Sequence, residues 1–182
     1  MRPIVSLAVF VAVSSPVHLA AQDVSVERGE LVSIIGGCHD CHTVGYNEAE
    51  GAIDAATALK GNPRGFQGPW GTTYAMNLRL TAAPLTEDGF VVYMKALKSL
   101  PPMPWYNVRA IPEDDLRSLY LYIKSLGDPG EQAPTSVPPG DTPRTPYVVL
   151  ASPQMPPPCT RDFDCGVGEV CGTDEPRACV PR

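Results

Sequence analysis

Two cysteines and two histidines lie together in one short run, Cys38-His39-Asp40-Cys41-His42. Thiols spaced in this way can add to the two vinyl groups of one haem, and the histidine that follows the second cysteine is then brought under the iron. A structural zinc site needs four protein ligands, and the Cys-x-x-Cys-His motif itself supplies only three. A thioredoxin-type redox pair accompanies a βαβ pattern, which this sequence lacks. The run therefore predicts one covalent haem c on Cys38 and Cys41, with His42 as axial ligand.

The other histidines offer no ligand for the opposite side of the iron. His18 lies in an N-terminal segment that we expect to be removed on export. His39 belongs to the same short turn as His42 and cannot reach the other face of the haem. The sixth ligand is therefore expected to be a thioether, since methionine opposite histidine is the usual electron-transfer pairing and raises the reduction potential.

Once Met1 is lost with that segment, the remaining methionines are Met76, Met94, Met103 and Met155. Met94 stands on the apolar face of a predicted helix, where methionine usually fills a core, and Met155 lies in a proline-rich tail. Met76 is a real alternative, because its loop must also approach the haem. Met103 has prolines on both sides, and a ligand held so rigidly needs little reorganisation when the iron changes charge. We therefore predict Met103 as the sixth ligand, ahead of Met76.

The first residues have the layout of a secretory signal peptide. Arg2 precedes the apolar run Ile4–Val13, and the small pair Ala20-Ala21 follows near the expected cleavage point. The run is shorter than the ~20 apolar residues that a membrane-spanning helix needs, and no second candidate follows. We expect removal of residues 1–21, no membrane span afterwards, and a periplasmic or extracellular location.

The net charge of the chain limits the kinds of molecule that it is expected to bind. The full chain has 14 Lys and Arg against 20 Asp and Glu, a formal net charge of −6, which becomes about −7 without Arg2. No run of Lys or Arg occurs in the mature part, so nucleic acid is not an expected partner. An acidic surface suits solubility and could steer a basic redox protein.

Composition divides the mature chain into three pieces. Residues 23–130 carry helical patterns and all of the haem chemistry. Residues 131–158 are so rich in proline that neither helix nor sheet interior can persist, which indicates a semi-rigid linker or a strap over the domain surface. A strap would be held down by the apolar run Tyr147-Val148-Val149-Leu150. Residues 159–182 are too few to fold by burial alone and need cross-links.

The last piece contains the other four cysteines: Cys159, Cys165, Cys171 and Cys179. In an exported chain, oxidising surroundings and their wide spacing favour disulfides over a metal site. Three pairings are possible and the sequence alone does not choose among them. Our working assignment is the alternating one, first to third and second to fourth. The piece resembles short disulfide-stapled repeats of secreted bacterial proteins, which would make it a docking module or a stable terminus.

Helical patterns dominate the first piece, and no alternating strand pattern competes, so the expected fold class is all-α. The predicted helices run from an N-cap at Ser25 to Gly36, from an N-cap at Thr86 to Pro101, and from Pro112, as first helical residue, to Gly127. The apolar residues of the first helix lie mostly on one side: Val26, Leu31, Val32, Ile34 and Ile35. Those of the last helix are Leu116, Leu119, Tyr120 and Ile123. A long Gly-rich coil separates the first predicted helix from the second. A compact domain tolerates such a coil only if something large fills the space inside it, and a haem would do so.

The order of these motifs resembles the monohaem class I c-type cytochromes of bacteria. The likeness covers about residues 24–127, from the first helix through Gly68-Pro69-Trp70-Gly71 and the run Pro101–Tyr106 to the last helix. The resemblance implies that the first and last helices cross beside the haem, with Gly29 against the face of Leu119 and Tyr120.

Two tryptophans are further candidates for contact with the haem. Trp70 and Trp105 could donate their ring N–H groups to the haem propionates, or could simply pack against the macrocycle. Neither would ligate the iron.

The predicted chemistry is the transfer of single electrons between redox partner proteins. With His42 and Met103 on the iron no position stays open, so an electron carrier rather than an enzyme is expected. The alternatives are a haem subunit or domain of a larger oxidoreductase, and a gas-binding sensor in which Met103 is labile. A third is a docking protein in which the cysteine-rich piece carries the function.

Overall fold

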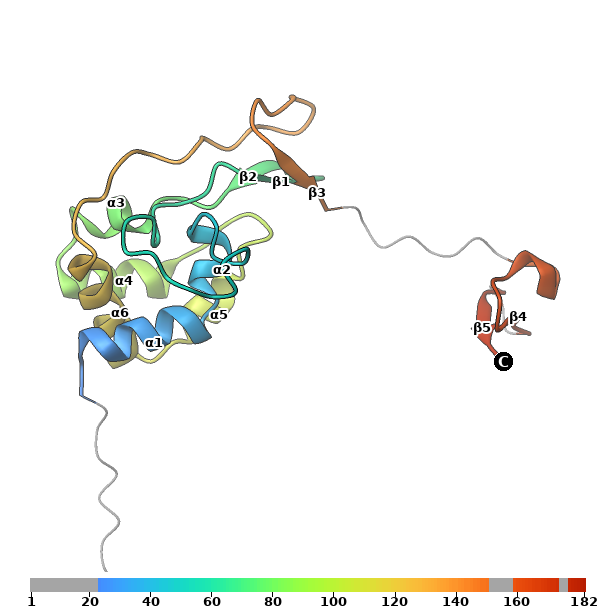
Figure 1. Cartoon of the computed structure of the whole chain (residues 1–182), viewed down its shortest axis with the longest axis horizontal. Helices are drawn as coiled ribbons and strands as arrows, with labels where there is room; N and C mark the ends of the chain where they lie inside the picture. Colours follow the sequence, from blue (N-terminus) through green and yellow to red (C-terminus); the bar gives the residue numbers. More distant parts are fainter. Residues whose placement is uncertain (1–22, 151–158, 174–176) are drawn as a thin grey trace, which may run out of the picture.

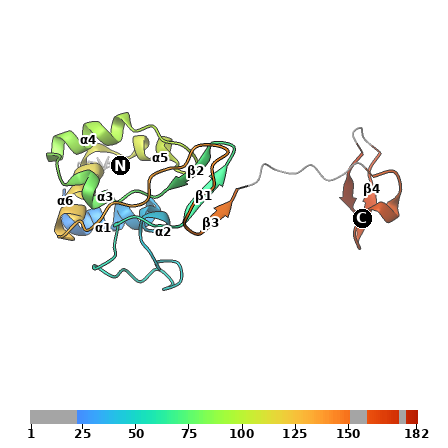
Figure 2. The same cartoon turned by 90° about the horizontal axis from the view of Figure 1, so that it is seen from above.

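The structure, a computed structural model, describes residues 23–150, 159–173 and 177–182; the predicted signal peptide and Met155 lie outside them. The helices are α1 (Val26–Ile35), α2 (Cys38–His42), α3 (Leu78–Ala82), α4 (Glu87–Ala96), α5 (Trp105–Ala110), α6 (Glu113–Ser125) and the short 3-10 helix η1 (Asp162–Asp164). The strands are β1 (Gly65–Gly68), β2 (Gly71–Tyr74), β3 (Tyr147–Val149), β4 (Glu169–Cys171) and β5 (Cys179–Pro181). The α-helices form one body, and β1, β2 and β3 lie beside it (Figures 1 and 2).

The expectation of an all-α fold is wrong. The described residues form two small sheets in addition to six α-helices. In one sheet, of order β2-β1-β3, β1 is antiparallel to β2 and parallel to β3; in the other, β4 and β5 are antiparallel. Each strand has only three or four residues. Strands this short cannot show the alternation of apolar and polar residues from which a strand is predicted.

The three predicted helices are present, and the N-caps of the first two are confirmed. The Ser25 hydroxyl accepts the N–H of Arg28 at 3.1 Å, and the Thr86 hydroxyl accepts the N–H of Gly89 at 3.1 Å. The last helix begins one residue later than predicted: Pro112 is its N-cap, and no side chain caps it. Three acidic residues in its first turn interact favourably with the helix dipole instead.

The first and last helices cross at Gly29. Gly29 is buried, and a Cβ atom there would overlap the backbone carbonyl of Ser118 and lie 2.7 Å from the Cβ of Tyr122. The crossing is therefore as expected on the side of α1, but it meets Ser118 and Tyr122 on α6 rather than Leu119 and Tyr120. Tyr120 packs instead against the ring of Phe90 in α4, with ring centroids 5.5 Å apart.

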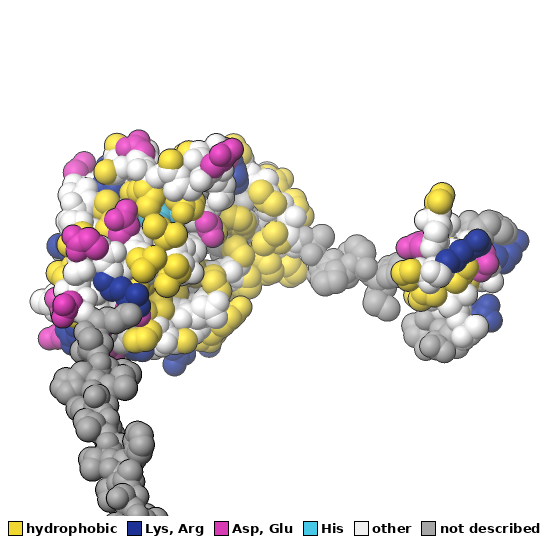
Figure 3. All heavy atoms as spheres, turned by 60° about the horizontal axis from the view of Figure 1, so that its bottom comes forward, with side chains coloured by type: hydrophobic (Ala, Val, Ile, Leu, Met, Phe, Trp, Pro, Cys, Tyr) yellow, Lys and Arg dark blue, Asp and Glu magenta, His cyan; other side chains and the backbone are white. Residues whose placement is uncertain are grey.

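The apolar residues of α1 do not form one buried face, contrary to the expectation from their pattern. Val32 is 3% exposed, whereas the other four are 37–69% exposed: Val26, Leu31, Ile34 and Ile35. The close crossing explains the difference, because it places a glycine and a serine on the buried side of α1. Figure 3 turns the edge that carries α1 toward the reader, and hydrophobic side chains gather on this face among scattered acidic ones.

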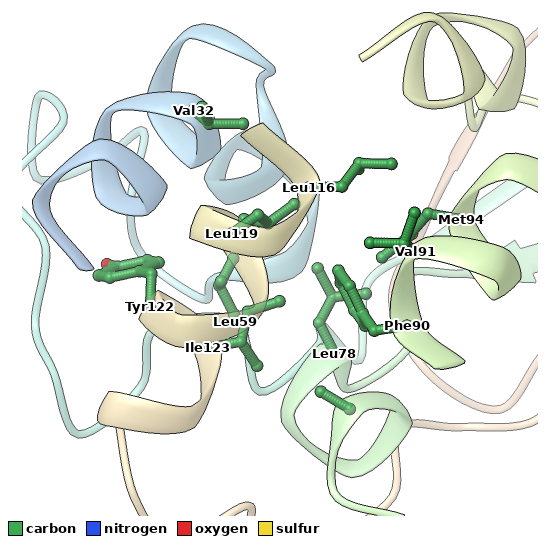
Figure 4. Close-up of a cluster of buried hydrophobic side chains, with 11 residues drawn as sticks. Val32, Leu59, Leu78, Phe90, Val91, Met94, Leu116, Leu119, Tyr122 and Ile123 are labelled. Carbon is green, nitrogen blue, oxygen red and sulfur yellow. The ribbon is translucent and has the colours of Figure 1, made fainter. Parts of the chain in front are cut away.

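One cluster of buried apolar side chains joins the helices (Figure 4). Its members are Val32, Leu59, Leu78, Ala82, Phe90, Val91, Met94, Leu116, Leu119, Tyr122 and Ile123. Met94 is only 5% exposed, which confirms that this methionine belongs to the core.

Two buried polar side chains attach the chain that follows α6. Asn77 donates to the carbonyls of Pro129 and Glu131 at 2.6 and 2.9 Å. Arg79 is 3% exposed, and its guanidinium donates to four backbone carbonyls, those of Ala55, Ala58, Leu126 and Asp128. Because a buried cation requires such partners, Arg79 ties the end of α6 to the loop before β1.

Residues 131–150, the described part of the predicted proline-rich piece, are called the strap below and pair with both edges of the β1-β2 hairpin (Figure 1). Val137 exchanges backbone hydrogen bonds of 2.8 Å with Thr72 on the β2 side. β3 then pairs with β1 on the other side. The expected apolar anchor is not buried, since Tyr147, Val148 and Val149 are 42%, 43% and 61% exposed. Backbone hydrogen bonds hold the strap instead.

The cysteine-rich piece contains two disulfides, Cys159–Cys171 and Cys165–Cys179. The alternating pairing is thereby confirmed. Disulfides indicate an oxidising compartment outside the cytoplasm. Within the described residues, no helix has the length and hydrophobicity needed to cross a bilayer.

Candidate functional site

The Cys-x-x-Cys-His run forms the single-turn helix α2. Gly37 precedes it in the left-handed region, with φ 67°, and turns the chain from α1 into α2. Cys38 and Cys41 stand one turn apart, so their side chains lie on the same side of α2. Both thiols are free and half-buried. Burial raises the pKa of Cys38 to about 11 and also raises the pKa of Cys41, so both sulfurs carry protons at neutral pH.

These neutral thiols do not fit a redox-active cysteine pair. Redox-active cysteines act as thiolates and lie where the pKa is lowered. Among the described residues, the one close group of three possible metal ligands is Cys159, Cys165 and Cys179, whose sulfurs are already in disulfides. Addition of a thiol S–H across a vinyl group needs no metal cluster, so the donor set of α2 fits a covalent haem.

His42 is held so that one ring nitrogen is reserved for a ligand. Its side chain is buried, and Nδ1 lies 2.7 Å from the backbone carbonyl oxygen of Met76. A carbonyl can only accept, so Nδ1 carries the proton. Burial lowers the pKa of His42, which keeps the ring neutral and leaves the Nε2 lone pair free to bind a metal. A second hydrogen bond that fixes the tautomer in this way is typical of a metal-ligating histidine.

The same hydrogen bond argues against Met76 as the sixth ligand. Nδ1 and Nε2 lie on opposite sides of the imidazole, so the backbone of Met76 lies behind the ring, on the side away from any iron at Nε2. The Met76 side chain is 40% exposed, and its sulfur is 3.5 Å from the hydroxyl of Thr81. Met76 contributes to this site through its carbonyl instead.

Met103 lies in the loop before α5 and is half-buried. The loop is fixed by a side chain of the hairpin, because the Thr73 hydroxyl donates to the carbonyl of Pro101 at 2.7 Å. Of the other sequence candidates, Met94 lies in the core, and Met155 lies outside the described residues.

The hairpin carries two buried polar atoms that have no hydrogen-bond partner, Nε1 of Trp70 and Oγ1 of Thr72. Buried donors normally find an acceptor, and each one left unsatisfied costs about 1–3 kcal/mol. A carboxylate is an acceptor suited to donors of this kind. Trp105 differs, since its ring contacts Tyr106 and lies under the guanidinium of Arg109, 5.5 Å from the ring centroid.

His39 is part of a buried hydrogen-bond chain that sequence reasoning missed. Ser33 donates its hydroxyl to the Glu30 carbonyl, so it must accept from Nε2 of His39 at 2.9 Å. Thr43 accepts the backbone N–H of Leu59 and donates its hydroxyl to Nδ1 of His39 at 2.8 Å. The chain links α1 and α2 to the loop before β1. The only sequence signal for this hydrogen-bond chain is a histidine followed four residues later by a residue with a hydroxyl group.

We expect His39 to make stability depend on pH. Burial lowers the pKa of His39 from 6.5 to about 4. Between these pH values the unfolded chain binds a proton at His39 and the folded protein does not. The contribution of His39 to the free energy of unfolding should therefore be greatest above about pH 6.5. It should fall by up to about 3 kcal/mol as the pH drops to about 4. Urea unfolding at a series of pH values measures this slope.

The His39→Gln variant is the control for that slope. Glutamine does not titrate, so the variant should be less stable at neutral pH yet lose less stability between pH 6.5 and 4. Equal slopes for the two proteins would mean that His39 is protonated without opening the hydrogen-bond chain.

Comparison with known proteins adds nothing to this geometry: no family model, no curated protein and no solved structure matches the chain.

Proposed function

We propose that this chain is an exported c-type cytochrome of the monohaem class I kind, which carries single electrons between redox partner proteins. Cys38 and Cys41 would hold the haem, and His42 and Met103 would ligate its iron. The observation that supports this most is the hydrogen bond from His42 to the Met76 carbonyl, which leaves Nε2 free in the same helical turn that carries the two free cysteines.

Each part of the site has a task in this proposal. A bound haem supplies the one-electron chemistry of its iron. The Met76 carbonyl fixes the tautomer and ring plane of His42, and the proline-flanked loop limits the movement of Met103, so little reorganisation accompanies a change in iron charge. The unpartnered donors of Trp70 and Thr72 suit the propionate groups of a haem.

The location outside the cytoplasm agrees with the two disulfides. The proposal adds that residues 1–21 direct export and are removed, so that the mature chain is periplasmic or extracellular. Covalent haem attachment would then take place in the same compartment as disulfide formation.

The test is covalent haem attachment. The full chain, expressed with its signal segment in a bacterium that attaches haem c, should be red and keep its haem on a denaturing gel after reduction. Replacing Cys38 and Cys41 with Ser should remove that signal. The matched control replaces the disulfide pair Cys159 and Cys171 with Ser and should retain one haem per chain. A colourless wild-type protein would refute the proposal.

A further inference from the structure

One stretch of backbone connects the strap with both proposed iron ligands. Residues 72–76, which comprise most of β2 and the two residues after it, make three contacts in succession. These are Thr72 with Val137 of the strap, Thr73 with the Pro101 carbonyl beside Met103, and the Met76 carbonyl with His42. A shift of this stretch would therefore reach both residues that are proposed to ligate the iron, His42 and Met103.

The strap lies directly on the hairpin at this point. Gly71 has φ +95°, which favours glycine, and a Cβ there would overlap the carbonyl oxygen of Val137 and lie 2.8 Å from the carbonyl carbon of Pro138. The strap backbone can make its hydrogen bonds to Thr72 only because residue 71 has no side chain.

The strap also holds the opposite edge of the hairpin. The N–H of Gly65 donates to the Pro146 carbonyl at 2.9 Å, and the N–H of Leu150 donates to the Gln67 carbonyl at 2.7 Å. The hydroxyl of Thr145 donates to that of Tyr74 at 2.9 Å. A two-stranded hairpin is marginally stable alone, so pairing along both edges supplies the support that fixes its position.

We propose that the strap is a clamp that stabilises methionine ligation of the iron, and that Thr73 is the positioning residue through which it acts. The strap fixes the hairpin, the hairpin presents the Thr73 hydroxyl, and that hydroxyl holds the Pro101 carbonyl two residues before Met103. Loosening any of these links should let Met103 leave the iron more easily. This inference rests on the proposed function and adds a role for the proline-rich segment.

Imidazole is a suitable probe, since it competes with methionine for the sixth position of ferric iron. The haem-bearing full chain is compared with Thr73→Val, which removes the hydrogen bond to Pro101, and with Val137→Pro, which removes the N–H that Thr72 accepts. Thr57→Val is the matched control, because the Thr57 hydroxyl bonds only to the nearby Asp54 carbonyl.

Thr73→Val should bind imidazole about fivefold more tightly than the wild type, the fold-change that corresponds to one ordinary hydrogen bond. Val137→Pro should act in the same direction, and Thr57→Val should match the wild type. The variant with both Thr73→Val and Val137→Pro should bind no more tightly than Thr73→Val alone, since the strap acts through that residue. Gly71→Ala, which displaces the strap sterically, gives an independent version of the strap variant.

Two results would refute the proposal that the strap is a clamp. One is an unchanged imidazole affinity in a Val137→Pro or Gly71→Ala protein that carries haem. The other is a double variant in which the change in imidazole-binding free energy equals the sum of the changes in the two single variants. A wild-type chain without covalent haem would instead refute the proposed function and the clamp together, so the two failures are distinguishable.

Discussion

If the chain carries the proposed haem, replacing Met103 with Ala should open the sixth position of its iron. The thioether-to-iron charge-transfer band of the oxidised protein should vanish, the reduced protein should bind carbon monoxide readily, and the reduction potential should fall by on the order of 100 mV, a fraction of the ~0.8 V that axial ligands span. The cause is loss of the sulfur that stabilises reduced iron. Optical spectra and a redox titration of the purified protein measure these changes.

Met76→Ala is the control for this experiment. Met76 contacts His42 through its backbone, which the substitution keeps, so the spectrum and potential should stay close to those of the wild type. If Met76→Ala loses the band and Met103→Ala keeps it, the ligand assignment is wrong. Carbon monoxide binding by the unmodified protein would favour the gas-sensor alternative.

Replacing Gly29 with Ala should cause the largest loss of stability from a single methyl group. The added Cβ would overlap the Ser118 backbone and come within 2.7 Å of the Tyr122 Cβ, neither of which can rotate away. The helices α1 and α6 would have to separate, and we expect a loss of about 3 kcal/mol in the free energy of unfolding. Urea unfolding followed by circular dichroism gives the value.

Gly89→Ala provides the same chemical change in another helix. The nearest atom to a Cβ at Gly89 is the side-chain oxygen of Thr86 at 3.1 Å, which a small shift can relieve. Alanine also favours a helix over glycine, so the change should be within about 1 kcal/mol of zero. Similar losses in the two variants would show that the crossing at Gly29 tolerates a side chain.

Local signals predicted the three longer helices, α1, α4 and α6, because caps are short-range. They missed the short helices α2, α3 and α5, and α4 ends at Ala96 rather than at Pro101. Ser25 and Thr86 each satisfy an N–H within three residues, and such bonds can be inferred from the residues themselves. The sheet could not be predicted in this way. The partners of β1 include Tyr147, far along the chain, and its pairing uses backbone groups that every residue type possesses.

The candidate site likewise has features that the sequence predicts and features that only the structure shows. The run from Cys38 to His42 specifies its chemistry through residue type and spacing, so it was evident in the sequence. The Met76 carbonyl that orients His42 and the four carbonyls around Arg79 are backbone groups brought near by the fold. No residue pattern marks such an acceptor, and only the structure reveals it.

The crossing of α1 and α6 joins two segments that are far apart in the order of synthesis. The backbone N–H of Ser25 bonds to the hydroxyl of Ser118, 93 residues later, and Arg28 pairs with Asp115 at 2.7 Å. A chain made from its N-terminus therefore presents α1 long before its partner helix exists. In the proposed cytochrome, Cys38 and Cys41, which follow α1 directly, would stay accessible for haem attachment during that interval, before α6 completes the crossing.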